Sequence, residues 1–123
     1  MAGLVHSIEE LVGRTPLMEL DRFERQQQCG AHLLAKLEFF NPTGSVKDRA
    51  ALSMLNAAEE AGLLKPGGTI VERPETKRTH PWQEPEREAT LDEIAAYCRR
   101  TGAYFNNQAA NPANPEAHYR TTG

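Results

Sequence analysis

The sequence predicts an α/β fold, and two observations support that prediction. Small and apolar residues recur at the spacing of one helix face in the middle of the chain: Val46, Ala50, Met54, Ala58 and Ala61. Gly62 ends this pattern, and the Pro-Gly-Gly turn at 66–68 leads into a run rich in β-branched residues at 69–72. A strand, a helix and a second strand in this order suit a right-handed parallel crossover, so we expect one here.

The elements before this helix are short. Ser7 and Glu10 have the spacing of a capping box, which predicts a short N-terminal helix. Apolar runs predict strands near 17–20 and 32–37. Ser45 is the expected N-cap of the long helix, because its hydroxyl can accept a hydrogen bond from an N–H group of the first turn.

A charged stretch follows residue 72. Residues 73–88 hold three prolines and eight charged residues, which favours a solvated linker over regular structure. We therefore divide the chain into an N-terminal portion at 1–72 that carries a lysine motif, a linker at 73–88, and a helix-strand-loop portion at 89–123.

The last of these portions contains a second capping box. Thr90 and Glu93 predict the start of a helix that Gly102 ends. A short strand is expected at 103–105, and Asn114 is expected to cap a last short helix that opens with a proline.

The composition and the net charge of the chain exclude several classes of binding partner and site. A net charge of −3 and a pI near 5.8 provide no basic surface for nucleic acid. No apolar run approaches the length of a membrane span, and the first ten residues lack the apolar segment of a signal peptide, so we expect a cytoplasmic protein. Cys29 and Cys98 form no C-x-x-C pair and are expected to be free thiols, and the four histidines lack metal-ligand spacing.

Lys47 is the leading candidate for a chemical centre. Residues 41–49 read NPTGSVKDR, so this lysine falls where a turn with Pro and Gly becomes a helix. The positive end of a helix dipole and its unpaired N–H groups disfavour the charged form of a lysine side chain. The neutral form of the amine is the one that can attack a carbonyl carbon. Reactive lysines hold carbonyl cofactors in this way, whereas an ordinary lysine after Gly-Ser is a solvated surface residue.

Several stretches carry a resemblance to a known family. They are residues 7–17 (SIEELVGRTPL), 41–49 and 57–72 (AAEEAGLLKPGGTIVE), and the pattern resumes at 111–118 (NPANPEAH) and 121–123 (TTG). In these stretches the chain closely resembles cysteine synthase (O-acetylserine sulfhydrylase) of the tryptophan-synthase-β-like family, which depends on pyridoxal 5′-phosphate (PLP). The resemblance implies a partial fold-type-II PLP enzyme with an incomplete three-layer αβα sheet.

The resemblance also implies a β-replacement reaction, in which O-acetylserine and sulfide give cysteine and acetate. In that family a lysine that matches Lys47 holds PLP covalently and then removes the α-proton of the amino-acid substrate, while PLP acts as the electron sink. Lys47 is therefore the expected catalytic and cofactor-binding residue.

The chain departs from the family pattern after Glu72. The family continues there into a Thr-Ser-Gly-Asn-Thr-Gly loop that holds the substrate carboxylate and the ring oxygen of PLP, whereas residues 73–82 read RPETKRTHPW. The sequence ends at Gly123, before the phosphate cradle of the family and the serine that pairs with the pyridine nitrogen. We therefore expect an internally deleted and C-terminally truncated member whose PLP binding is weak or absent.

Gln108 is the second site residue that the resemblance implies. It matches a family glutamine that precedes the Asn-Pro-Ala-Asn motif and helps to bind the substrate carboxylate. An aromatic residue usually follows that glutamine, but here the next residues are Ala109 and Ala110. Without the resemblance, residues 106–108 (NNQ) would be interpreted as a polar loop.

Two classes of function stay open from the sequence. The first is a PLP enzyme of cysteine biosynthesis, or a fragment of a cystathionine β-synthase-like enzyme, acting on a small amino-acid substrate. The second is a non-catalytic remnant that keeps an interaction surface, either in a homo-oligomer or in a complex with a full-length relative. The missing loop after Glu72 favours the second class for this chain, whereas the intact motif around Lys47 indicates descent from the first.

Overall fold

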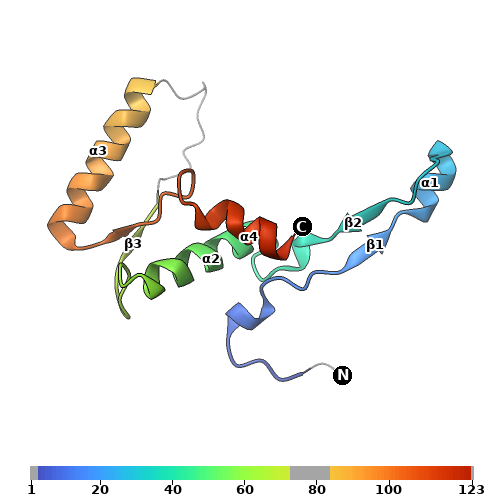
Figure 1. Cartoon of the computed structure of the whole chain (residues 1–123), viewed down its shortest axis with the longest axis horizontal. Coiled ribbons are helices and arrows are strands. Elements are labelled where there is room, and N and C mark those ends of the chain that lie inside the picture. The colour runs from blue at the N-terminus through green and yellow to red at the C-terminus, as the bar shows by residue number, and fades with distance from the viewer. Residues whose placement is uncertain (1–2, 73–83, 123) are drawn as a thin grey trace. The chain divides into compact units, whose positions relative to one another are not determined.

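A computed structural model describes residues 3–72 and 84–122 of the chain (Figure 1). The elements follow in the order η1 (Ile8–Leu11), β1 (Leu17–Glu19), α1 (Asp21–Gln27), β2 (Leu34–Lys36), η2 (Glu38–Phe40), α2 (Lys47–Glu60), β3 (Ile70–Val71), α3 (Glu84–Thr101), β4 (Tyr104–Phe105) and α4 (Ala113–Thr121), where η marks a 3-10 helix. They form two compact units. Unit 1 comprises Met1–Leu52 and Pro115–Gly123, and unit 2 comprises Ser53–Asn114.

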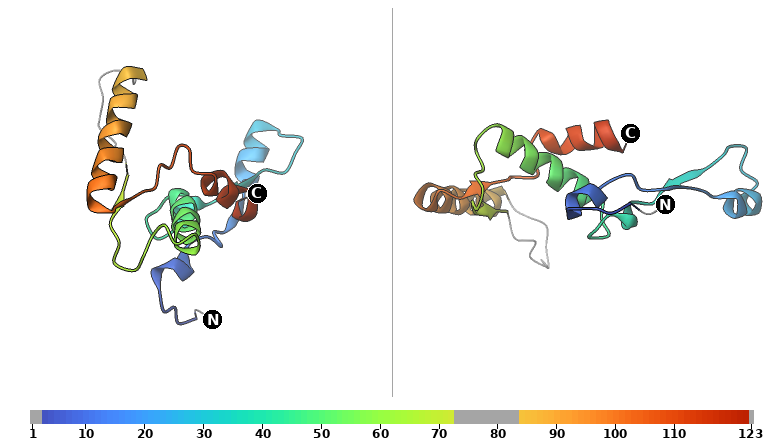
Figure 2. Two further views of the ribbon diagram at one scale, coloured as in Figure 1. Left: turned by 60° about the vertical axis from the view of Figure 1, so that its left-hand side comes forward. Right: turned by 90° about the horizontal axis from the view of Figure 1, so that it is seen from below.

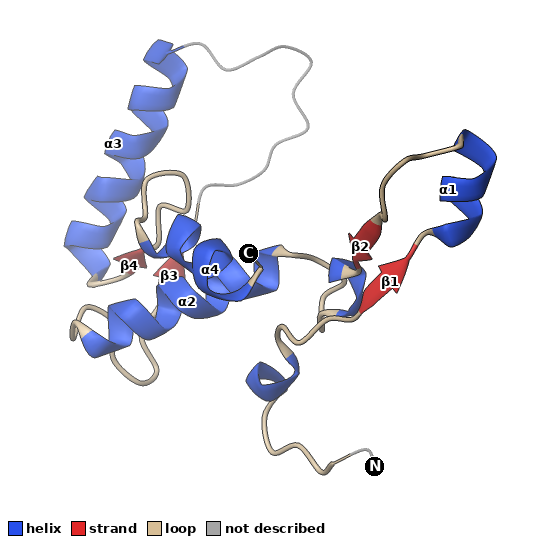
Figure 3. Cartoon of the chain, turned by 45° about the vertical axis from the view of Figure 1, so that its right-hand side comes forward, coloured by secondary structure: helices blue, strands red, loops and turns tan. Residues whose placement is uncertain are grey.

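Unit 1 contains an antiparallel pair of strands with a helix between them. β1 pairs with β2 in the register Leu17↔Lys36, Met18↔Ala35 and Glu19↔Leu34. The ribbon runs out along β1, turns through α1 and returns along β2, so that α1 forms the tip of an arm (Figure 3). The sequence patterns predicted both strands but not α1, which is only seven residues long.

Helix α2 starts and ends as its sequence predicts. The hydroxyl of Ser45 accepts a hydrogen bond from the backbone N–H of Lys47 at 3.1 Å. At the other end, Gly62 takes a φ of 69°, its N–H donates to the carbonyl of Glu59, and the N–H of Leu63 donates to the carbonyl of Ala58. These two bonds form a Schellman motif, for which a residue in the left-handed region is required. Figure 2 shows the chain leaving α2 and turning towards β3.

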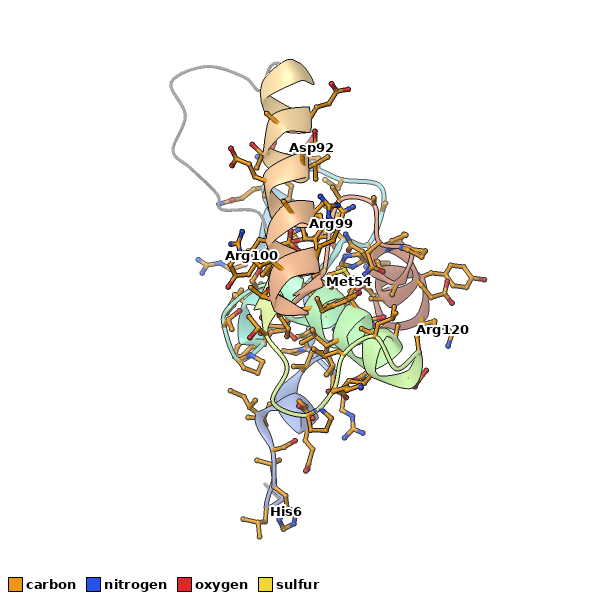
Figure 4. The ribbon with its side chains drawn as sticks, turned by 90° about the vertical axis from the view of Figure 1, so that its left-hand side faces the viewer. His6, Met54, Asp92, Arg99, Arg100 and Arg120 are labelled. Atoms are coloured by element: carbon orange, nitrogen blue, oxygen red, sulfur yellow. The ribbon has the colours of Figure 1, made fainter. Side chains whose placement is uncertain are left out.

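Unit 2 holds a parallel pair of strands and its crossover helix. β3 and β4 pair in the register Ile70↔Tyr104 and Val71↔Phe105, and α3 connects them and contacts β4. The core of this unit contains five buried apolar residues: Met54, Ala58, Leu64, Ile94 and Ala103. Figure 4 labels Met54 within it, together with Asp92, Arg99 and Arg100, which are exposed along α3.

The parallel crossover lies in a different place from the one expected. We expected the strand at 32–37, the lysine helix and the strand at 69–72 to form it. In the structure β2 pairs with β1 instead, and the parallel pair is β3–β4 with α3 as its connection. The partner of β2 is the strand that is nearer in sequence, and closing this shorter loop costs less chain entropy.

The start of α3 also differs from the expectation. We expected the helix to begin at Thr90, but it begins at Glu84, so residues 84–88 of the expected linker are helical. Pro85 does not prevent this, because proline is tolerated in a first helical turn, where its missing N–H would have no partner. The rest of the expected linker, residues 73–83, lies outside the described part of the chain.

Neither Ser7 nor Asn114 caps its helix as expected. The N-terminal segment is a 3-10 helix in which Ser7 makes no side-chain cap, while the carboxylate of Glu10 accepts a hydrogen bond from the N–H of His6. Helix α4 begins at Ala113, and the side chain of Asn111 accepts the hydrogen bond from its N–H at 3.0 Å. Asn111 therefore does what we expected of Asn114, because α4 begins before Asn114.

Candidate functional site

Lys47 is the first residue of α2, and its side chain is exposed. Its backbone N–H is bonded to Ser45, as described above, so the lysine is held where the turn becomes a helix. The position at the helix start is therefore as the sequence predicts. An accessible amine on a backbone with fixed geometry can form a covalent bond to a carbonyl compound.

The turn before Lys47 is fastened to the first turn of α2. The carboxylate of Asp48 accepts one hydrogen bond from the backbone N–H of Thr43 at 2.8 Å and another from the hydroxyl of Thr43. Gly44 takes a φ of 75° and its N–H donates to the carbonyl of Asn41 at 2.8 Å. A carboxylate in a first helical turn also interacts favourably with the helix dipole. Asp48 thus fixes the path of the chain that leads to Lys47.

The other end of this turn is fixed by Asn41, whose exposed fraction is 4%. Its side-chain oxygen accepts a hydrogen bond from the N–H of Gly13 at 2.8 Å. Its amide nitrogen donates to both the backbone carbonyl and the carboxylate of Glu38, each at 2.8 Å. Every polar atom of the buried amide group is therefore used, and it joins the segment at Gly13 to the segment that holds Glu38 and Asn41 itself.

A buried ion pair lies directly beside this amide. The guanidinium of Arg49 binds the carboxylate of Glu38 through two hydrogen bonds, Nε to Oε2 at 2.7 Å and Nη2 to Oε1 at 3.0 Å. The side chains are only 4% and 17% exposed. Arg49 also donates to the hydroxyl of Thr15 at 3.1 Å and to the carbonyl of Thr121 at 3.0 Å. We call Thr15, Glu38, Asn41 and Arg49 the buried polar cluster.

The hydrogen bond from Arg49 is the main reason that the pKa of Glu38 falls from 4.5 to about 2. Burial alone would raise this pKa, but hydrogen bonds from Thr15 and Asn41 and the charge of Arg49 act in the same direction as the first bond. Glu38 is therefore ionised across the ordinary pH range. Its negative charge satisfies the buried guanidinium two residues after Lys47.

The buried polar cluster was not found from the sequence. Charged residues are usually exposed, and this tendency conceals the role of Arg49. One signal was present, because Arg49 lies three residues after Val46 and next to Ala50, on the apolar stripe of the helix. An arginine on an apolar stripe indicates a buried partner, here Glu38.

Gln108 lies half-buried in the loop that follows β4. Its backbone N–H donates to the carboxylate of Glu72 at 3.2 Å, and its carbonyl accepts a hydrogen bond from the side chain of Asn114 at 2.9 Å. The side chain of Asn111 binds the carbonyl of Asn106 at 3.1 Å within the same loop. Amide side chains therefore hold the loop that carries Gln108 just beyond the carboxyl end of β4.

A hollow of about 320 Å³ lies beside this loop in unit 2. Met54, Ala58 and Leu63 give it an apolar wall, while Asn106 and Asn107 belong to its polar side. The side-chain oxygen of Asn106 is buried and has no hydrogen-bond partner within the described part of the chain. Gln108 itself does not line this hollow.

The two predicted site residues belong to different units, Lys47 to unit 1 and Gln108 to unit 2. Among residues 3–72 and 84–122, no group of three or more His, Cys, Asp or Glu side chains could hold a metal ion. None of the described helices combines the length and the apolar character that crossing a membrane requires.

Comparison with known proteins identifies similar enzymes. The chain is 56% identical over 70 residues to cysteine synthase 1 of Emericella nidulans, and 51% identical over 72 residues to a probable cysteine synthase of Bacillus subtilis. It is also 51% identical over 61 residues to cystathionine beta-synthase of Rattus norvegicus. These matches cover 57%, 58% and 50% of this chain but only 18%, 22% and 11% of the relatives. The chain therefore matches a small part of each of these proteins.

Solved structures are similar over almost the whole chain. A hydrogen sulfide-producing enzyme from Fusobacterium nucleatum has a TM-score of 0.78 and 25% identity, with 99% of this chain and 52% of that chain covered. O-ureido-L-serine synthase has a TM-score of 0.75 and 30% identity, with 98% and 49% covered. The fold is thus a partial α/β fold of the fold-type-II PLP enzymes. The family model for pyridoxal-phosphate dependent enzymes matches residues 8–74, more than half of the chain, and the chain belongs to that family.

Proposed function

We propose that this chain carries the lysine portion of a cysteine synthase-like enzyme and that Lys47 is the residue to which PLP attaches. The observation that carries the proposal is the placement of Lys47: an exposed amine at the first residue of α2, after a turn held by Asp48 and Asn41. This turn lies within the segment that matches the family. The reaction we propose is the one that the sequence resemblance implies, in which O-acetylserine and sulfide give cysteine and acetate, and the similarity to proteins named cysteine synthase supports it.

Lys47 and the turn that holds it are suited to the covalent attachment of PLP. The amine of Lys47 is accessible and its backbone is fixed, which is what covalent attachment through a lysine needs. PLP, when bound, supplies an electron sink to an attached amino acid. Lys47 would hold the cofactor and afterwards take a proton from the α-carbon of the substrate. Gln108 would bind the substrate carboxylate, and its loop is held by Glu72 and Asn114.

Covalent trapping tests the assignment of Lys47. The purified chain is incubated with PLP, reduced with borohydride and digested, and the labelled peptides are identified by mass spectrometry. We expect the label at Lys47. Lys36 and Lys65 are internal controls, because the amine of Lys36 donates to the carbonyl of Thr15 at 2.7 Å and Lys65 is an exposed lysine of unit 2. A label spread equally over these three lysines would show that Lys47 has no special reactivity.

We further propose that the 123-residue chain makes no cysteine by itself. Positioning of the reacting groups can account for roughly 7–11 kcal/mol of a catalysed barrier, and the family loop that positions the substrate is replaced after Glu72. The assay adds PLP, O-acetylserine and sulfide to the chain and to its Lys47→Ala variant, both free of any full-length enzyme. Cysteine formation that depends on Lys47 would refute this proposal, whereas equal formation by both proteins would show contamination or chemistry of free PLP.

A second candidate function is a non-catalytic remnant that associates with another polypeptide. It is favoured by the surface of unit 1, where large apolar side chains such as Leu17 and Leu34 are exposed. A fragment of a cystathionine β-synthase-like enzyme is a further form of the first proposal, because the chain is 51% identical over 61 residues to such an enzyme. We also propose a cytoplasmic location, which the free thiols of Cys29 and Cys98 support.

A further inference from the structure

The hollow beside the loop that carries Gln108 is lined by residues of unit 2 alone, and its volume is about 320 Å³. Met54, which Figure 4 labels, and Ala58 belong to its wall, and each is only 2% exposed. Tyr104 and Phe105 of β4 add aromatic side chains to that wall. Small-molecule sites in proteins begin at about 300 Å³, and an apolar cavity of about 150 Å³ already takes up benzene. The hollow therefore has room for a compact ring compound.

The side chains that line the hollow are apolar, aromatic or amide, and none of them is charged. A phosphate group or an amino-acid zwitterion carries charges that have to be paired when they leave water. The lining offers no charged partner for such groups, so the hollow suits a neutral compound. This property distinguishes it from the site that we propose for PLP and an amino-acid substrate.

The polar side of the hollow is held in place by hydrogen bonds within its own loop. The N–H groups of Ala110 and Asn111 both donate to the carbonyl of Asn107, at 2.9 and 3.0 Å. Asn107 takes a φ of 44°, in the left-handed region that asparagine tolerates. Ala57 and Ala110 also line the hollow, and their side chains are too short to fill it. The hollow is therefore formed before any ligand binds, which reduces the cost of binding.

Asn106 supplies a polar atom that lacks a partner. Its side-chain oxygen is buried and accepts no hydrogen bond within residues 3–72 and 84–122. Most buried polar groups in proteins have a partner, because a buried acceptor without a donor lowers stability. The terminal torsion of an asparagine side chain is soft, so the amide can turn this oxygen towards a donor in the hollow that Asn106 lines. A ligand with one O–H group would supply the missing hydrogen bond.

We propose that the hollow is a binding site for a neutral aromatic compound that carries one hydroxyl group, a compound of the phenol class. The ring packs against Met54 and Phe105, and the hydroxyl donates a hydrogen bond to the side-chain oxygen of Asn106. Lys47 belongs to the other unit, so this site is separate from it. The proposal does not rest on the proposed function or on PLP.

The test is an NMR titration of the full 123-residue chain, without PLP, with phenol and with anisole. Anisole has the same ring and an oxygen acceptor but lacks the O–H group. We expect both compounds to shift the signals of Ala58, Phe105 and Asn106 until the site is saturated. Phenol should bind roughly fivefold more tightly, as one net hydrogen bond allows. Equal affinities for the two compounds, or shifts spread over both units without saturation, would overturn the proposal.

The variant Asn106→Leu separates the hydrogen bond from the packing of the ring. Leucine has a branched shape close to that of asparagine but no polar side-chain atom. The variant should therefore bind phenol and anisole equally, with the anisole affinity of the parent chain. It should unfold at a urea concentration no lower than the parent does, because it removes a buried acceptor that has no donor. A variant that still prefers phenol as the parent does would contradict the role of Asn106.

The variant Ala57→Leu tests where the compounds bind. The larger side chain occupies part of the hollow and should weaken the binding of both compounds roughly tenfold or more, while leucine keeps a high helix propensity. Ala51→Leu is the matched control, because Ala51 is another exposed residue of α2 and does not line the hollow. It should bind both compounds as the parent does. Parent-like binding by Ala57→Leu, or an equal loss in the two variants, would show that the compounds bind elsewhere. Since PLP is absent from these measurements, failure of covalent trapping at Lys47 would leave their outcome unchanged.

Discussion

Replacing Glu38 with Gln should destabilise unit 1 by roughly 3–5 kcal/mol, because it leaves a guanidinium buried without its counter-charge. The side chain of Arg49 is 4% exposed and makes two of its hydrogen bonds to the carboxylate of Glu38. An amide has nearly the same shape as the carboxylate, so the change adds no cavity. The substitution removes the negative charge, and the NH₂ group of the glutamine would face the donor groups of Arg49.

The pKa of Glu38 gives a second route to the magnitude. A fall from 4.5 to about 2 corresponds to about 3 kcal/mol of preference for the ionised form in the folded state. The side chain is 17% exposed, so screening by solvent reduces this value only in part. The buried ion pair and the lowered pKa of Glu38 therefore both predict a large effect for this one substitution.

Urea unfolding followed by circular dichroism at pH 7 measures the effect. Glu116→Gln is the matched control, because Glu116 pairs with Arg120 on the surface of α4, where the two side chains are 47% and 74% exposed. That change should cost less than about 0.5 kcal/mol. A Glu38→Gln variant that is as stable as Glu116→Gln would show that the buried pair contributes nothing net, and would refute the reasoning about Arg49.

The remaining predictions concern acid, a turn and the core. The pKa of Glu38 is lower in the folded state, so its stabilisation is present above pH 4.5 and is lost as the pH falls towards 2; the parent chain should lose about 3 kcal/mol in that range, and Glu38→Gln should not. Gly68→Ala should cost roughly 1–3 kcal/mol, because its Cβ would lie 2.8 Å from the carbonyl oxygen of Lys65; Gly30→Ala, which meets open space, is the control in the same urea assay. Ile94→Ala should cost about 2–5 kcal/mol, since its side chain is buried in the core of unit 2, and an unchanged midpoint of thermal unfolding would contradict that burial.

The parts of the fold that could be predicted from the sequence are those set by neighbouring residues. The periodicity from Val46 onward and the glycine at 62 specify α2 and its end, because both act within a few residues of the chain. The partner of β2 could not be predicted in this way. Its apolar run is compatible with several neighbours, and the pattern of the run alone does not indicate that the nearer strand β1 is preferred to β3.

The same distinction applies to the candidate site. Lys47 could be placed at a helix start because the turn and the helix around it are local features. The buried polar cluster could not, because Arg49 finds its partners at Thr15, Glu38 and Thr121, which are separated from it by 34, 11 and 72 positions. A charged residue is indistinguishable from a surface residue until those segments meet. The exposure of Leu17, Met18 and Leu34 was not predicted either, because alternation along a strand does not reveal whether another element covers a face.

The hydrogen bond from Arg49 to the carbonyl of Thr121 has a consequence for how this chain can change in evolution. It joins the two ends of unit 1, so the 62 residues between Leu52 and Pro115 form an excursion that leaves the unit and returns to it. Insertions and deletions within that excursion leave both partners of the bond in place. Lineages could therefore shorten or rebuild the middle of the chain while the turn that carries Lys47 keeps its supports.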